Sequence, residues 1–76
     1  MRERISVNAN IHFGKPCVAG TRILVVNVLE LVGQGITFST IIRDYYPELG
    51  IEDIKACIQY AIDIVSAEEL HITSQG

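Results

Sequence analysis

Apolar residues recur along most of the chain at the three- to four-residue spacing of amphipathic helices. Glycine and proline divide this pattern into separate segments. Thr37 is suited to cap the second segment, and Pro47 is suited to stop it. The pattern predicts three helices, at about residues 25–34, 38–46 and 51–66.

The third predicted helix is apolar around most of its circumference. Its polar positions form one narrow stripe, made of Glu52, Lys55, Gln59, Asp63 and Ser66. A helix of this kind is buried on more than one side, and in a protein of three helices that points to a second subunit. The residues we expect at a dimer or toxin interface are Ile54, Ile58, Ile62, Ile64 and Val65. We expect the tail, residues 67–76, to fray.

The segment before the helices reads as short extended pieces broken by turns. Gly14 and Gly20 can adopt positive φ, and a residue that precedes a proline, as Lys15 precedes Pro16, is driven to an extended conformation. Residues 5–23 are therefore predicted to form a small β-hairpin. The whole chain, residues 1–76, is predicted to be one mainly α domain: a three-helix, helix-turn-helix (homeodomain-like) bundle with a short N-terminal β-hairpin.

Charge divides the chain into two unequal parts. The formal net charge is −3, which does not suggest a strongly basic nucleic-acid module. Nearly all of the first 22 residues' charge is positive, whereas the rest of the chain is acidic. The candidate contacts with nucleic acid or a protein partner are Arg2, Arg4, Lys15 and Arg22. Arg22 could equally tie the hairpin to a helix C-terminus through carbonyl hydrogen bonds, and we favour that structural role.

Few groups are available for catalysis or metal binding. Cys17, Cys57, His12 and His71 are scattered and lack the close spacing of metal ligands. We therefore expect no catalytic residue, no metal and no cofactor, and do not expect an enzyme. No apolar run approaches the roughly 18 residues of a membrane span, and the N-terminus lacks the apolar core of a signal peptide. The expected location is the cytoplasm, with no membrane partner.

The run from Gly14 to Ile23 resembles the signature of the domain-of-unknown-function family numbered 433. That signature is glycine-lysine-proline, an apolar residue, then glycine-threonine-arginine-isoleucine, which here places Gly14, Pro16, Gly20 and Thr21 in the signature turn. The resemblance covers about residues 4–65. This sequence departs from the family at Ala9, Leu24 and Gly50, and an extra Tyr46 lengthens the second helix by one residue.

The resemblance implies a function for the chain. Members of that family are thought to be antitoxins of type II toxin–antitoxin modules, paired with toxins that resemble PIN-domain nucleases. We therefore expect a dimeric antitoxin that binds and neutralises such a toxin, with binding of its own operator DNA left open. The alternative is a stand-alone dimeric helix-turn-helix DNA-binding regulator, and a third reading is an interaction module with neither role. The acidic start of the third helix, at Glu52 and Asp53, argues against standard reading of DNA bases by that helix.

Overall fold

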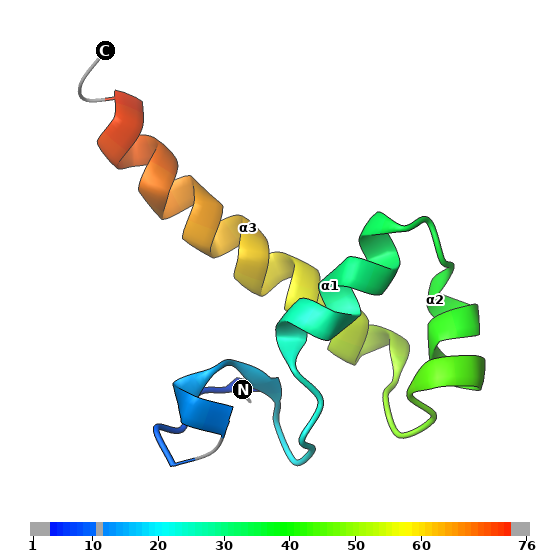
Figure 1. Cartoon of the computed structure of the whole chain (residues 1–76). Coiled ribbons are helices and arrows are strands. Elements are labelled where there is room, and N and C mark those ends of the chain that lie inside the picture. Colours follow the sequence, from blue (N-terminus) through cyan, green and yellow to red (C-terminus); the bar gives the residue numbers. More distant parts are fainter. Residues whose placement is uncertain (1–3, 11, 74–76) are drawn as a thin grey trace.

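The computed structural model describes the backbone of residues 4–10 and 12–73, and their side chains as far as Ala67 except that of His12. The described chain is mainly helical behind a two-stranded N-terminal hairpin, as the sequence predicts (Figure 1). The elements, in chain order, are β1 (Ile5–Ser6), the 3₁₀ turn η1 (His12–Gly14), β2 (Cys17–Val18), α1 (Val25–Gly33), α2 (Phe38–Thr40), the π-helical turn η2 (Ile41–Tyr45) and α3 (Ile51–Thr73).

The hairpin is short and antiparallel. Ile5 pairs with Val18 and Ser6 pairs with Cys17, and the N–H of Ala19 adds a 2.7 Å hydrogen bond to the carbonyl of Arg4. Cys17 and Val18 are buried, so β2 is the strand that joins the core. The strands therefore attach the N-terminal segment to the helices instead of forming a layer of their own.

One hydrophobic core holds the helices and β2 together. Its buried residues come from every part of the described chain: Val18, Ile23, Val25, Val28, Ile41, Leu49, Ile54 and Cys57. Val28, Ile41, Ile54 and Cys57 are fully enclosed. Because each helix contributes a fully buried side chain, α1, η2 and the first half of α3 depend on the same core.

The second helix differs from the single regular helix that the sequence predicts over residues 38–46. Thr37 caps it as expected, because its hydroxyl oxygen accepts a hydrogen bond from the N–H of Thr40 at 3.2 Å. After Thr40 the backbone widens into the π turn η2, in which the N–H of Tyr46 reaches the carbonyl of Ile41 at 2.8 Å. A π turn accommodates one more residue than an α turn. The extra Tyr46 is thus absorbed while Ile41 stays fully buried.

The start of α3 is fixed by its third residue. Asp53 accepts a hydrogen bond from the N–H of Gly50 at 2.9 Å, the reciprocal half of a capping box. The same carboxylate accepts a hydrogen bond from the Arg4 guanidinium at 3.0 Å. Asp53 therefore caps α3 and ties the N-terminal hairpin to it.

The far end of α3 lies well beyond the predicted boundary at residue 66. The helix is continuous to Thr73, so most of the expected tail is helical, and residues 74–76 fall outside the described part. With 23 residues, α3 is about 34 Å long, whereas the nine residues of α1 span about 14 Å. Figure 1 shows the second half of α3 projecting away from the other helices.

Candidate functional site

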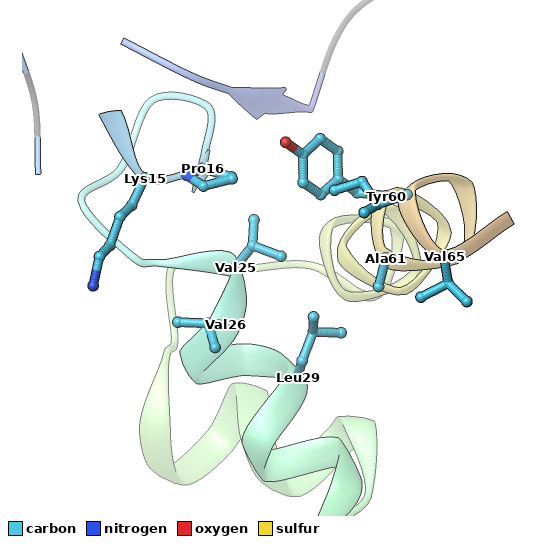
Figure 2. A pocket seen from close by; sticks show the side chains of 9 residues that line it. Lys15, Pro16, Val25, Val26, Leu29, Tyr60, Ala61 and Val65 are labelled. Carbon is cyan, nitrogen blue, oxygen red and sulfur yellow. The ribbon is translucent and has the colours of Figure 1, made fainter. Parts of the chain in front are cut away.

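The most prominent concave feature of the described residues is an apolar groove between α1 and α3. Its cavity volume is about 420 Å³. Its walls are formed by Val25, Val26 and Leu29 of α1, by Tyr60, Ala61, Ile64 and Val65 of α3, and by Lys15 and Pro16 of the loop before β2 (Figure 2). Carbon atoms of aliphatic side chains make up nearly all of this surface, so the groove is suited to an apolar ligand surface.

The groove has a buried floor and exposed rims. Val25 is only 3% exposed and forms part of the core. In contrast, Val26 is 48% exposed on the α1 side, and Ile64 and Val65 are 45% and 57% exposed on the α3 side. Large aliphatic side chains exposed together on two facing helices form a patch typical of an interaction surface.

The groove exists because the two helices differ in length. The short α1 packs against α3 only along part of its length, and the second half of α3 continues past it. The apolar periodicity of α3 nevertheless extends through Ala61, Ile64 and Val65. These residues therefore have apolar side chains but little of the chain's own surface to cover them.

The family signature shapes the loop at one end of the groove. Pro16 lines the groove, and its carbonyl accepts a 3.0 Å hydrogen bond from the N–H of Val25, the first residue of α1. Thr21 donates to the carbonyl of Val18 at 2.8 Å and accepts from the N–H of Ile23 at 3.0 Å. Gly14 and Gly20 both adopt positive φ, near 80°. The signature residues thus set the path from β2 into α1.

Lys15 is the charged side chain of the groove, and the ring of Tyr60 projects from α3 on the facing side (Figure 2). Lys15 is exposed, and no ion pair joins it to another described residue. Since the remaining lining is apolar, Lys15 gives the groove one cationic end. A ligand that fills the groove would be apolar, with a negative charge near Lys15.

The cationic residues predicted as contacts fall into different settings. Arg4 is paired with Asp53, Lys15 lines the groove, and Arg22 is exposed. Among the described residues no hydrogen bond from the Arg22 side chain is found, so the expected tie to a helix C-terminus is absent from that set. Arg4 provides the tie, and to a helix N-terminus. Arg2 lies outside the described residues.

The predicted interface residues also separate. Ile54 is 0% exposed in the core, and its assignment to an interface is wrong, because α1 and η2 already cover it within the chain. Ile58 is partly buried against the core. Ile62 is 49% exposed but does not line the groove, whereas Ile64 and Val65 do. Sequence reasoning missed the contribution of Val26, Leu29 and Tyr60, which periodicity alone assigns to a core.

Chemistry other than binding finds little support in the described side chains. No group of three or more histidine, cysteine, aspartate or glutamate residues there could hold a metal ion. Both cysteines are free and buried, and burial raises the pKa of the Cys57 thiol to about 11, with the Asp53 carboxylate adding to the effect. At neutral pH Cys57 is therefore a protonated core residue. No helix within the described range is long and apolar enough to cross a membrane.

The fold and groove define a small, mainly helical domain with an N-terminal hairpin and an exposed apolar surface. The family model described as Protein of unknown function (DUF433) matches residues 5–61, and the chain belongs to this family. The matched range includes the signature loop, α1 and the first half of α3. Comparison with curated proteins and with solved structures gives no match.

Proposed function

We propose that this protein is the antitoxin of a type II toxin–antitoxin module, which acts as a homodimer to bind and neutralise a toxin resembling PIN-domain nucleases. The groove between α1 and α3 is the toxin-binding site in this proposal. The observation that carries it is the exposed apolar lining of the groove, with Val26, Ile64 and Val65 about half exposed. The resemblance described above supplies the class of the partner.

The shape of the groove favours a helical segment as its ligand. Two helices with a hollow between them accept a third helix, which buries one apolar face against both walls. Burial of apolar surface contributes roughly 25 cal/mol per Å², and half-exposed valine and isoleucine side chains can supply such surface. The bound segment should carry apolar anchors at helical spacing and an acidic residue that reaches Lys15.

Neutralisation by occlusion also agrees with the chemistry of this chain. A protein that blocks a nuclease needs a complementary surface and no catalytic group of its own. The described side chains provide such a surface, whereas Cys57 is buried and protonated and the metal-ligand types are dispersed.

The direct test is co-expression of this chain with the open reading frame beside its gene. We expect a stable complex on gel filtration and loss of the nuclease activity of the partner within that complex. A neighbour that encodes no nuclease-like protein, or a neighbour that elutes separately from this chain, would contradict the proposal.

A second candidate is a dimeric DNA-binding regulator. It is favoured by Lys15 and Arg22, which are exposed and form no ion pair with other described residues. Glu52 and Asp53 at the start of α3 weigh against it, because they repel phosphate there. Mobility-shift assays at two salt concentrations, with Lys15→Ala and Arg22→Ala, separate the two: DNA binding that both variants abolish supports the regulator.

A further inference from the structure

A second apolar surface lies on α3, on a different side from the groove. Ile51, Ile58 and Ile62 are seven and four residues apart, so they share one face of the helix. We call these three residues the α3 stripe. Ile51 and Ile62 are 47% and 49% exposed, and Ile58 is partly buried. The stripe is therefore uncovered at both of its ends.

The α3 stripe and the groove are separate surfaces. Ile62 belongs to the stripe and Ile64 lines the groove. With about 100° between successive residues, these two positions lie about 200° apart around the helix. A ligand in the groove therefore leaves Ile62 exposed.

The charged residues beside the stripe are arranged symmetrically about Ile62. Lys55 lies seven residues before Ile62, and Glu69 lies seven residues after it on the same continuous helix. Residues seven apart occupy nearly the same face. The Lys55 side chain is 61% exposed and only 3.9 Å from the similarly exposed Glu52, which leaves it available to another partner.

We propose that the α3 stripe binds the α3 stripe of a second copy of this chain, with the two helices antiparallel and Ile62 facing Ile62 of the second copy. This arrangement places position 55 of each copy opposite position 69 of the other, so that lysine faces glutamate twice. A parallel arrangement places lysine opposite lysine and glutamate opposite glutamate, which is unfavourable. The charge pattern therefore selects both the occupant and its direction.

The length of α3 supports the same register. The helix runs from Ile51 to Thr73, and Ile62 is its central residue. Two antiparallel helices centred on Ile62 consequently overlap along the whole of α3. The projecting second half of each helix (Figure 1) then lies beside the first half of the other and gains the cover that its own chain does not provide. The contact is two-fold symmetric, as in most homodimers.

This inference rests on the dimeric form of the proposed antitoxin, but it is tested on the chain alone. Sedimentation equilibrium at micromolar concentration should show a dimer for the unmodified chain and a monomer for Ile62→Glu, with a dissociation constant raised at least about a hundredfold. Ile64→Glu is the matched control, because Ile64 has similar exposure two residues away, and it should remain dimeric. Circular dichroism checks that both variants stay helical.

Charge exchange tests the direction of the helices. Lys55→Glu and Glu69→Lys should each weaken the dimer about three- to tenfold, and the double variant should restore it. In a separate measurement, Ile62→Cys should give a disulfide-linked dimer under oxidising conditions, since Cys17 and Cys57 are buried. A monomeric unmodified chain, a dimer that Ile64→Glu breaks and Ile62→Glu does not, or a double variant weaker than both single variants would each overturn the inference.

The two proposals fail separately. If toxin binding is lost only when the groove is altered, the antitoxin assignment stands whatever the outcome for Ile62. If the chain dimerises through Ile62 but binds no toxin, the dimer contact stands and the antitoxin assignment fails.

Discussion

At the scale of single residues, the family signature has a structural explanation in the turn before α1. The N–H of Thr21 donates to the carbonyl of Val18 at 3.0 Å, and Gly20 has a φ of 80°. A type II turn requires positive φ at its third residue, which glycine adopts without strain. The Thr21 hydroxyl then bonds to Val18 and Ile23 on either side of the turn. Glycine and threonine are thus needed for the shape of the loop that leads into α1.

We expect Thr21→Val to destabilise the protein by about 1–3 kcal/mol, because it removes the hydroxyl bonds to Val18 and Ile23 and leaves the Ile23 N–H without its acceptor. Thr21→Ser keeps the hydroxyl and should cost much less. Urea denaturation of the three proteins measures the difference. Equal losses for valine and serine would show that the methyl group matters and the hydrogen bonds do not.

The thiol of Cys57 should make stability depend on alkaline pH. Its native pKa is about 11, against an ordinary value of 9.0. Between these values the unfolded chain releases the proton and the native chain keeps it, so stability falls as pH rises through that range. We expect the stability difference between the unmodified protein and Cys57→Ala to shrink from about pH 8 to about pH 10 in urea titrations. A difference that does not change with pH would contradict this account.

At the scale of elements, the second helix shows what the sequence could and could not predict. Its N-cap at Thr37 follows from local chemistry, because a threonine there can bond to the N–H of Thr40. The π turn after Thr40 could not be predicted in the same way. It arises because the core holds Ile41 fixed on one side while Pro47 ends the helix on the other, and local propensity contains neither constraint.

The third helix gives the complementary case. Periodicity predicts its apolar face correctly but cannot say which neighbour covers each residue, so the buried Ile54 and the exposed Ile62 look alike in sequence. The groove could not be predicted either, because it depends on how far α1 reaches along α3. The end of α3 is misplaced because Ser66 and the acidic residues after it weaken the apolar pattern without interrupting the helix.

Deletion of Tyr45 tests the account of the π turn. Tyr45 is 48% exposed, and its removal should convert η2 into a regular α turn with Ile41 still buried. We expect the change in stability to be no more than about 1 kcal/mol. Deletion of Gln59 is the control, since in the regular helix α3 it rotates every later residue by about 100° and should destroy the groove. Unfolding on deletion of Tyr45, measured by circular dichroism, would contradict the prediction.

At the scale of the whole molecule, α3 serves two proposed contacts on different sides. The groove contains Ile64, and the α3 stripe contains Ile62. A dimer formed through the stripe therefore leaves one groove open in each copy. We expect two toxin molecules to bind per dimer, which light scattering of the purified complex measures. A complex with one toxin per dimer would mean that the two surfaces interfere.

The central claim is that the groove binds the toxin, and the most direct test is the dissociation constant of the complex with one groove residue changed. Val26 is 48% exposed in the groove, and Val7 is 58% exposed outside it, so they form a matched pair. Titration calorimetry with the toxin should show binding weakened at least about a hundredfold for Val26→Glu and unchanged for Val7→Glu. Undiminished binding by Val26→Glu would contradict the account.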